Sequence, residues 1–428
     1  MAGSKPGPVV IIGGGFAGLA CAKALGAAGV ETVLIDRHNY HLFVPLLYQV
    51  ATAALSPADI AQPIRRLLRR YPSVRVELGA VETLDTVAHE VVLADGRRVR
   101  YGRLVLATGS VCNYFGHAEW AAHAPCPRDL PDATAIRARV LGALEEAETV
   151  TEPQRRSALM TFVVVGGGPT GVEMAGALAE LVRHSLRRDF RAIDTRLSRI
   201  ILIEAGERLL STFPEPLTRY AGERLARLGI DVRLKTAVER IDAEGVVVAG
   251  ERLPARTVIW GAGTRAAEAA VWLPGVAAGR GGRIPVEADL AVPGFGRSIF
   301  AIGDIALLEG RDGLPLPALA QVAKQQGEFL GRALAHELSG QGAVPAFAFR
   351  NRGNTAIIGR NAAIFDFGRG RRMKGRLAWL LWAFVHIYLL AGFERRLLVA
   401  TQWLARYLTG QRGARLITRE RDEPPPGG

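Results

Sequence analysis

The stretch VVIIGGGFAGLACAKALGAAGVETVLID, from Val9 to Asp36, decides the fold of this chain. Its first four residues are apolar and predict a buried strand, and the pattern Gly13-x-Gly15-x-x-Gly18 follows at once and opens an alanine-rich helix. A second apolar strand then ends on Asp36. In this order the glycines allow a tight turn and a close approach of the backbone to a pyrophosphate, and the acid can bind ribose hydroxyls. The stretch therefore predicts a dinucleotide-binding unit.

The same pattern returns later in the chain. An apolar strand precedes Gly166-x-Gly168-x-x-Gly171, a helix is expected over 172–186, and another apolar strand ends on Glu204. The distance from the last glycine to the acid exceeds the usual ~20 residues, which predicts an extended helix and a charged loop. Two such units predict an α/β fold with two Rossmann-like dinucleotide-binding domains. One would hold a bound flavin and the other a nicotinamide, so that a hydride can pass between stacked rings.

The acid of the second unit bears on which nicotinamide is used. A carboxylate at Glu204 can accept a hydrogen bond from a ribose 2′-OH but repels a 2′-phosphate, which favours NADH over NADPH. Several arginines lie nearby in the sequence, Arg208 closest of all, and they weaken that preference.

Two other apolar strands end in turns of small residues. One ends in Thr108-Gly109 and the other in Gly303-Asp304. Small residues let the chain cross close to a bound cofactor, and the Asp304 carboxylate could reach a cofactor hydroxyl.

The C-terminal region is basic and contains two apolar stretches. Residues 350–428 hold 15 Lys and Arg against 5 Asp and Glu, a net charge of +10 within a total of +13. Leu377–Phe393 is almost unbroken apolar sequence but is shorter than the ~20 residues of a spanning helix, and Leu397–Leu408 is amphipathic and carries Trp403. Apolar faces with aromatic residues, flanked by arginines, are typical of segments that lie in a bilayer interface and meet anionic lipid. An internal or dimer-forming helical hairpin is the alternative.

The remaining composition excludes several classes of protein. The length of 428 residues suits two or three globular domains. Cys21, Cys112 and Cys126 have no metal-ligand spacing and do not suggest a disulfide framework, so we expect no metal site and a reducing compartment. The first apolar run is the opening strand and not a signal peptide.

Motifs in the right order along nearly the whole chain resemble those of the type II NADH:quinone oxidoreductases. This family belongs to the superfamily of flavin disulfide-reductase-like enzymes with two dinucleotide domains. The matching pieces are IIGGGFAGL (11–19), NYHLFVPLLYQVAT (39–52), LVLATGS (104–110), NYFG (113–116), VVVGGGPTGVEMAGALAEL (163–181), VIWGAG (258–263), IFAIGDIA (299–306), ALAQVAKQQGEFLG (318–331) and RGNTAIIGRNAAI (352–364). Without this resemblance, the apolar residues after Asp36 would be interpreted as a packing segment.

The resemblance implies which residues bind the two nucleotides. FAD would be held by Gly13, Gly15, Gly18, Asp36, Val81 at the adenine, Thr108, Gly109 and Asp304 at the ribityl chain. NADH would be held by Gly166, Gly168, Gly171, Glu204 and Gly263.

The resemblance also implies three catalytic residues. Glu173 would lie near the stacked nicotinamide and isoalloxazine rings, although an acid in the first turn of a helix is also favoured by the helix dipole alone. Gln321 and Gln325 stand four residues apart, so both amides share one face of a helix. They would lie beside the flavin, where amides can donate to quinone carbonyls without bringing a charge into an apolar tunnel. A polar helix surface is the alternative for both.

The implied protein is a monotopic, membrane-associated enzyme of a respiratory chain on the cytoplasmic face of the inner membrane. It would pass a hydride from NADH to FAD and two electrons to a membrane quinone, without ion pumping. Its partners would be NADH, quinone and an anionic lipid surface, with no nucleic acid, and a homodimer is left open. The expected parts are an FAD-binding domain (1–115 and 276–349), a connector (116–155), an NADH-binding domain (156–275) and a membrane-interfacial helical region (350–428).

Two other functions remain as alternatives. A sulfide:quinone oxidoreductase shares the fold and the anchor, but its chemistry needs cysteines flanking the flavin, one of them late in the chain, and no cysteine follows Cys126. A flavoprotein that acts mainly by redox-dependent binding of a partner or a nucleic acid would use the basic C-terminus. The Trp- and Leu-rich sequence of that region favours lipid instead.

Overall fold

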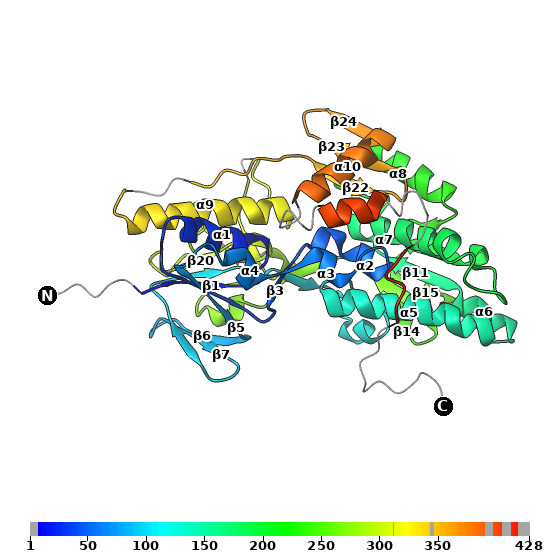
Figure 1. Ribbon diagram of the computed structural model, residues 1–428, viewed down its shortest axis with the longest axis horizontal. Helices are drawn as coiled ribbons and strands as arrows, with labels where there is room; N and C mark the ends of the chain where they lie inside the picture. The colour runs from blue at the N-terminus through cyan, green and yellow to red at the C-terminus, as the bar shows by residue number, and fades with distance from the viewer. Residues whose placement is uncertain (1–6, 311, 343–345, 390–396, 405–411, 418–428) are drawn as a thin grey trace. The chain divides into compact units, whose positions relative to one another are not determined.

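The computed structural model describes residues 7–310, 312–342, 346–389, 397–404 and 412–417 (Figure 1). Within these ranges the chain forms two compact units. The first unit comprises Met1–Leu42, Ala61–Val111 and Thr264–Arg352, and the second comprises Phe43–Ile60, Cys112–Gly263 and Gly353–Gly428. Each unit contains one of the two glycine patterns.

This division departs from the expected domains. Residues 43–60, expected in the FAD-binding domain, belong to the second unit because α2 (Leu47–Ala51) packs against α5 (Leu130–Thr149) and α7 (Pro169–Glu180). The expected connector, 116–155, contains α5 and is part of the same unit for the same reason. Three short ranges also fall on the other side of their expected boundaries, namely 112–115, 264–275 and 350–352.

The first unit is built on a parallel sheet of five strands. Its order is β20-β9-β1-β2-β5, and the opening strand of the sequence lies at its centre. Central parallel strands are covered on both faces, which is why VVII is apolar at every position and buried throughout. The strands are β1 (Val9–Ile12), β2 (Thr32–Asp36), β5 (Val74–Leu78), β9 (Arg103–Leu106) and β20 (Ile299–Ala301).

Two helices far apart in the sequence pack against each other on one face of this sheet. They are α1 (Phe16–Ala27) and α9 (Ala320–Leu338), which lie side by side in Figure 1. A Cβ on Gly327 would lie 2.1 Å from the carbonyl oxygen of Ala17, so the backbones touch there. The other face carries the antiparallel strands β6 (Val81–Asp85), β7 (Glu90–Leu93) and β8 (Arg98–Arg100).

The second unit repeats this design with a parallel sheet of four strands. Its order is β13-β12-β11-β17, formed by β11 (Thr161–Val165), β12 (Arg199–Ile203), β13 (Asp231–Arg233) and β17 (Thr257–Trp260). Antiparallel strands β14 (Val238–Asp242), β15 (Gly245–Val248) and β16 (Glu251–Pro254) form a second, smaller sheet, and α8 (Glu215–Arg227) packs against β13. The helix expected over 172–186 begins earlier, at Pro169, and its last part is a π-helical turn at Leu181–Ser185.

The cysteines depart from the expectation. Cys112 and Cys126 form a disulfide, so the prediction of no disulfide was wrong for this pair. Fourteen residues separate them in the sequence, but the chain between them folds back and brings their Cα atoms to 6.3 Å. Cys21 is free and buried. Over the residues that the structure describes, no group of three His, Cys, Asp or Glu side chains is placed to hold a metal ion.

The C-terminal region is only partly helical, which corrects the expectation. An antiparallel meander of β22 (Asn354–Ile357), β23 (Ala363–Asp366) and β24 (Arg372–Gly375) precedes α10 (Arg376–Leu389), which packs on it. Residues 397–404 are also helical. The ends of both predicted apolar stretches, at 390–393 and 405–408, lie outside the described residues. None of the described helices combines the length and the apolar character needed to cross a membrane.

The remaining elements are short. In and next to the first unit they are β3 (Tyr40–Leu42), β4 (Ala61–Pro63), α4 (Ile64–Leu68), β10 (Ser110–Cys112), β18 (Thr264–Ala266), η5 (Ala270–Trp272), η6 (Arg280–Gly282), β19 (Ile284–Pro285), η7 (Gly303–Ile305) and β21 (Ala306–Leu307). In the second unit they are η1 (Val44–Leu46), α3 (Pro57–Ile60), η2 (Ala118–Ala122), α6 (Pro153–Leu159) and η4 (Thr195–Leu197).

Candidate functional site

The first glycine pattern forms a tight turn that leaves room beside helix α1. Gly13 has a φ of +107°, and a Cβ on it would lie 2.3 Å from the carbonyl oxygen of Ala107. A Cβ on Gly18 would lie 1.8 Å from the carbonyl oxygen of Gly13, so only glycine lets the helix approach the turn this closely. At Gly15, which caps α1, a Cβ would meet no atom within 4 Å. This open space at the N–H groups of a helix start fits the pyrophosphate of a dinucleotide.

Asp36 lies at the end of β2, beside this turn. Its Oδ2 accepts a hydrogen bond from the backbone N–H of Gly14 at 2.5 Å, and its Oδ1 accepts one from His38 at 2.7 Å. An ionised carboxylate offers about four acceptor positions. The two backbone bonds therefore fix the orientation of Asp36 and leave acceptor capacity for ribose hydroxyls.

The second glycine pattern has the same geometry within its own unit. Gly166 has a φ of +108°, and a Cβ on Gly171 would lie 1.7 Å from the carbonyl oxygen of Gly166. Gly168 caps α7, and a Cβ there would again meet no atom within 4 Å. The sequence repeat is therefore also a repeat of backbone conformation and of open space at a helix start.

Glu204 takes the position in the second unit that Asp36 takes in the first. Its Oε2 accepts a hydrogen bond from the backbone N–H of Gly167, and its Oε1 accepts one from Gly206 at 2.6 Å. The nearby Arg208 donates to the carbonyl oxygen of Ser211 at 2.8 Å. The charged group that is hydrogen-bonded to the glycine turn is thus Glu204 and not Arg208. A carboxylate at this position fits a free ribose 2′-OH better than a 2′-phosphate.

The two small-residue turns lie together in the first unit, because β9 and β20 are neighbouring strands. Gly109 has a φ of +77°, and the hydroxyl of Thr108 is buried and has no hydrogen-bond partner among the described residues. Asp304 lies on η7, where its Oδ2 accepts a hydrogen bond from the Ser110 hydroxyl at 2.6 Å. An orphaned buried hydroxyl and an anchored carboxylate are groups that a polar cofactor can bind.

The last two predicted nucleotide contacts lie on separate units. Gly263, in the second unit, has a φ of +153°, accepts a hydrogen bond from the Asn113 N–H at 3.1 Å, and would place a Cβ 3.3 Å from the ring of Phe115. Val81, in the first unit, begins β6 opposite Leu93. The adenine contact of Val81 stays a prediction.

Gln321 and Gln325 lie on the first two turns of α9, as expected, and both hold the chain at 350–352. Gln321 Oε1 accepts a hydrogen bond from the Arg352 N–H at 3.1 Å. Gln325 binds both backbone groups of Arg350, accepting at 3.0 Å through Oε1 and donating at 3.0 Å through Nε2. An amide NH2 carries two hydrogens, so one of those on Gln325 remains for another acceptor.

Glu173 lies partly buried on α7 of the second unit, and it is the most perturbed acid of the glycine-pattern helices. Burial raises the pKa of its carboxyl group to about 8, and a long hydrogen bond of 3.3 Å from the Ile357 N–H to Oε1 opposes this shift. Tyr48, on α2 of the same unit, has its pKa raised well above the usual value, first by burial and then by the charge of Glu173. A pKa of about 8 favours the protonated form of the Glu173 carboxyl at neutral pH.

Two family comparisons cover most of the chain. Residues 7–327 match the pyridine nucleotide-disulphide oxidoreductase family, and residues 351–412 match the NDH2 C-terminal domain. The type II NADH:quinone oxidoreductase Ndh of Mycobacterium tuberculosis is 37% identical to this chain, over 96% of this chain and 90% of its own length. This chain belongs to the type II NADH:quinone oxidoreductases.

More distant relatives extend this result. The internal alternative NAD(P)H-ubiquinone oxidoreductase A1 of Arabidopsis thaliana is 29% identical, over 96% of this chain and 85% of its own length. The structure of NDH2 from Plasmodium falciparum in complex with NADH has a TM-score of 0.87 at 20% identity, over 96% of this chain and 99% of that one. The sulfide:quinone oxidoreductase of Aquifex aeolicus has a TM-score of 0.73 at 19% identity, over 91% of each chain. These two structures show the shared fold, and the predicted α/β class and family are confirmed.

Sequence reasoning missed one residue that this type II oxidoreductase uses to build the first unit's site. Gln326 is 1% exposed, and its Oε1 accepts a hydrogen bond from the Gly303 N–H at 2.7 Å. This bond fixes the turn that carries Asp304. The motif AQVAKQQG contains three glutamines, and only the packing of α9 on α1 distinguishes the buried one.

A buried polar network in the second unit was also missed. Gln49, on α2, donates to the Tyr48 hydroxyl at 3.0 Å and accepts from the Trp403 indole at 3.1 Å. Arg412 donates to the carbonyl oxygen of Thr52 at 2.6 Å and pairs with Glu180, at the end of α7, at 3.0 Å. The contacts of Trp403 with Gln49 and of Arg412 with Glu180 join residues far apart in the sequence. The apolar stretch after Asp36 is therefore a packing segment whose polar groups bind the C-terminal region.

Proposed function

We propose that the two units of this chain divide the reaction of a type II NADH:quinone oxidoreductase between them. The enzyme passes a hydride from NADH to FAD and two electrons on to a quinone, and it pumps no ions. The observation that carries the division is the repeat of one geometry, a glycine turn with an acid bonded to it, once in each unit. From the resemblance of these motifs to those of the family, we assign the first site to FAD and the second to NADH.

In the first unit, the residues around the turn would bind and orient FAD. The open space beside Gly15, at the start of α1, suits the pyrophosphate, and Asp36 suits the ribose. The Thr108 hydroxyl and the Asp304 carboxylate suit the polar chain that leads to the flavin ring. When bound, FAD supplies the hydride acceptor and the electron donor to quinone.

In the second unit, the corresponding residues would bind NADH. Gly166, Gly168 and Gly171 leave the helix start of α7 open for the pyrophosphate. Glu204 would accept from the ribose hydroxyls, and Gly263 would let the backbone pass close to the nucleotide. Glu173 lies on the same helix as Gly171, so the glycine turn that would bind NADH and the Glu173 carboxyl would be held in a fixed relation by α7.

Glu173 would act as a proton store for the reaction. Reduction of a quinone takes up two protons, and a carboxyl with a pKa of about 8 would hold one at neutral pH and could release it close to that pH. The Ile357 N–H donates to Oε1, which would leave Oε2 as the oxygen that carries the proton to be moved.

Gln321 and Gln325 would meet the quinone. Their amides share one face of α9, and the remaining N–H of Gln325 can donate to a quinone carbonyl. Their bonds to the backbone at 350–352 hold both side chains in fixed rotamers, which favours a defined position for the quinone ring.

The exposed apolar side chains of the C-terminal helices would meet the lipid at the cytoplasmic face of the membrane. Their outward faces carry Leu377, Leu380, Phe384, Tyr388, Leu397, Leu398 and Leu404, all well exposed. Contiguous exposed apolar side chains mark a contact surface, and the basic residues of the region favour anionic lipid. Such a surface would bring a lipid-soluble quinone to the enzyme. A homodimer through the same face is the competing arrangement.

One stopped-flow experiment tests the reaction. The flavin-loaded enzyme is mixed without oxygen with NADH, NADPH or sulfide, and the flavin absorbance is followed. We expect rapid bleaching by NADH, slower bleaching by NADPH, and recovery of the absorbance when a quinone is added. Bleaching by sulfide but not by NADH would reject the function in favour of a sulfide:quinone oxidoreductase.

A further inference from the structure

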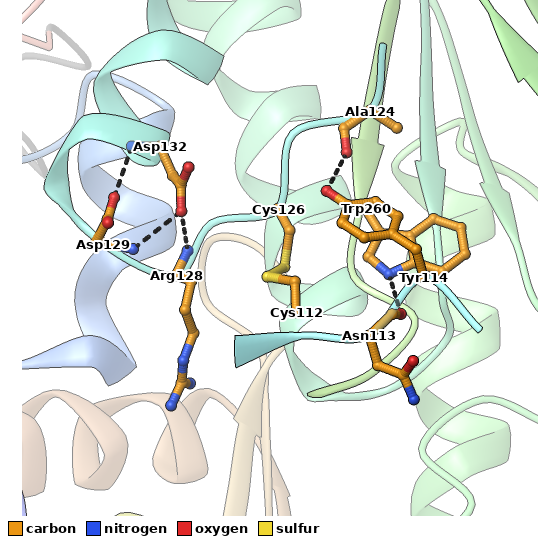
Figure 2. The surroundings of a disulfide bond; sticks show 9 residues. All are labelled: Cys112, Asn113, Tyr114, Ala124, Cys126, Arg128, Asp129, Asp132 and Trp260. Atoms are coloured by element: carbon orange, nitrogen blue, oxygen red, sulfur yellow. Dashed lines mark hydrogen bonds between the residues drawn. A yellow bond between two sulfur atoms is a disulfide. The ribbon is translucent and has the colours of Figure 1, made fainter. Parts of the chain in front are cut away.

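The disulfide between Cys112 and Cys126 closes a loop that carries an exposed aromatic side chain. Figure 2 shows the bond with the side chains around it. Cys126 is buried, whereas Cys112 is partly exposed. Cys112 packs against the core of the second unit but is the more exposed of the two, so we expect a reagent in solution to approach the bond from the Cys112 side.

Both arms of this loop are hydrogen-bonded to the end of β17. The backbone N–H of Trp260 donates to the carbonyl oxygen of Pro125 at 3.0 Å, and its indole N–H donates to the carbonyl oxygen of Asn113 at 2.9 Å. The ring of Tyr114 stacks on Trp260, with centroids 5.1 Å apart, and its hydroxyl donates to the carbonyl oxygen of Ala124 (Figure 2). Trp260 is thus enclosed by the two arms that the disulfide joins.

The Cys112 arm also reaches the glycine that we assign to NADH. Asn113 donates its N–H to the carbonyl oxygen of Gly263, and the next residues bring the ring of Phe115 over Gly263. Phe115 is 62% exposed and has a φ of +52°, a left-handed conformation that a bulky residue rarely adopts. Its N–H donates to the Asn113 side chain at 2.9 Å, which supports this conformation. The fold therefore holds an exposed, flat side chain beside the turn.

The Cys126 arm is fixed independently of the disulfide. It leads into α5, where Asp129 and Asp132 form a reciprocal capping box (Figure 2). The bond from Trp260 to Pro125 holds the same arm. Opening of the disulfide would remove a covalent constraint from the Cys112 arm, which carries Phe115, and leave that arm held by the hydrogen bonds of Asn113 and Tyr114 and by the stacking of Tyr114 on Trp260.

We propose that Cys112 and Cys126 form a thiol-exchange site that controls NADH binding through Phe115. With the disulfide closed, Phe115 forms an aromatic wall beside Gly263, against which a flat ring of the nucleotide packs. When a small-molecule dithiol opens the disulfide, this wall is held only by the non-covalent contacts of Asn113 and Tyr114, it becomes more mobile, and NADH binds more weakly. The inference rests on the proposed function only in placing NADH at Gly263.

The exchange is a two-step reaction that balances. A thiolate of the dithiol attacks Sγ of Cys112, the bond to Cys126 breaks, and Cys126 leaves as a thiolate. The second thiol of the reagent then attacks the mixed disulfide and releases Cys112, and the reagent departs as a cyclic disulfide. Two electrons pass from the dithiol to the cysteine pair, and each released thiolate takes up one proton.

The experiment compares the two states of the flavin-loaded full chain. One sample is left oxidised, and the other is reduced with dithiothreitol, alkylated and desalted, so that no thiol remains to react with flavin. Mass spectrometry of the labelled peptides measures the fraction of the protein in which Cys112 and Cys126 are alkylated. The NADH concentration that half-saturates flavin reduction is then measured by stopped flow. We expect a rise of roughly three- to tenfold on opening, the loss expected when an aromatic side chain must be ordered by the ligand.

Variants separate this effect from other consequences of reduction. Cys112→Ala with Cys126→Ala should show the weakened NADH affinity at all times and no response to dithiothreitol. Cys21→Ala, which removes only the third cysteine, should respond as the original chain does. Phe115→Ala should weaken NADH binding in the oxidised state and leave little further change on reduction.

Each outcome decides the question. An unchanged half-saturating concentration after opening, or two free thiols at 112 and 126 in the untreated protein, would overturn the thiol-exchange site. Failure of NADH to bleach the flavin in either state would instead reject the proposed function. A loss of bound flavin on opening would show that the disulfide serves stability and not NADH binding.

Discussion

Glu173 makes the stability of the second unit depend on pH. Burial raises the pKa of its carboxyl group from the ordinary 4.5 to about 8. Between these values the folded state holds a proton that the unfolded state has lost, so stability falls as the pH rises through this window. The slope for one such group is at most about 1.4 kcal/mol per pH unit.

Glu173→Gln should remove this dependence, because an amide cannot ionise and can still accept the bond from Ile357. We expect the two proteins to be closest in stability below pH 4.5 and the variant to become the more stable of the two as the pH rises to about 8. Thermal unfolding at several pH values measures the difference, and titration of all other groups cancels between the two proteins. Parallel curves would show that Glu173 ionises normally.

The paired glutamines should affect the two half-reactions unequally. Gln321→Ala or Gln325→Ala would remove a neutral hydrogen bond to the quinone. Each substitution should slow flavin reoxidation by quinone about three- to tenfold and leave flavin reduction by NADH nearly unchanged. Stopped-flow traces of the separate half-reactions measure both rates. Gln341→Ala, an exposed glutamine beyond α9, is the matched control. Equal losses in both half-reactions would assign the pair a purely structural function.

Some single residues could be predicted from the sequence and others could not. Asp36 and Glu204 were placed correctly beside their glycine turns because an acid at the end of a parallel strand must lie at that edge of the sheet. The bond from Gln326 to Gly303 could not be predicted, because burial depends on how two helices distant in sequence meet. The Cys112–Cys126 bond was missed for the same reason, since the return of its loop depends on packing around Trp260.

At the scale of elements, matched substitutions should distinguish the functions of the two glycine-pattern helices. A Cβ at Gly18 or Gly171 would lie 1.8 or 1.7 Å from a backbone oxygen, so alanine at either position must displace the turn. We expect Gly18→Ala to purify with little or no flavin. Gly171→Ala should keep its flavin but need at least tenfold more NADH for the same rate of bleaching.

The control for this pair is Gly142→Ala on α5, where a Cβ would meet no atom within 4 Å. It should keep both flavin and NADH affinity. Absorbance at the flavin band and NADH titration distinguish the three proteins. Loss of flavin from Gly171→Ala, with flavin retained by Gly18→Ala, would instead assign FAD to the second unit and NADH to the first.

The order of the elements was more predictable than their grouping. Both parallel sheets follow from apolar strands that alternate with helices, and both were expected. The packing of residues 43–60 on the second unit was not, because it depends on contacts between α2, α5 and α7 that no local pattern encodes. The strands at 354–375 were not predicted because they are short and directly precede the much longer apolar run of α10.

At the scale of the whole molecule, the exposed side chains of α10 should decide where the enzyme resides. Leu380→Ser with Phe384→Ser removes two large apolar groups from its outward face while sparing its buried residues. We expect co-sedimentation with anionic liposomes to fall several-fold, because both groups would otherwise leave water for the bilayer interface. Val87→Ser, which removes an exposed apolar side chain in the first unit, is the control.

Activity with a water-soluble quinone analogue should survive the double substitution, which would show that the fold is intact. Sedimentation in the absence of lipid tests the competing arrangement. A change from dimer to monomer in the double variant, with liposome binding unaltered, would assign this face to a second copy of the chain.

The pairing of α1 with α9 has a consequence for how the protein is made. The first unit begins at the N-terminus, but its sheet lacks β20 and its helix layer lacks α9 until Leu338 has left the ribosome. The long central segment of the second unit, Cys112–Gly263, emerges whole before that point. Synthesis should therefore leave the first unit, to which we assign the flavin, half-built for most of its duration, and we expect flavin to be captured late. Ribosome-bound chains stopped before residue 299 should bind no flavin, and chains long enough to bring Arg352 outside the ribosome should bind it, as flavin fluorescence would report.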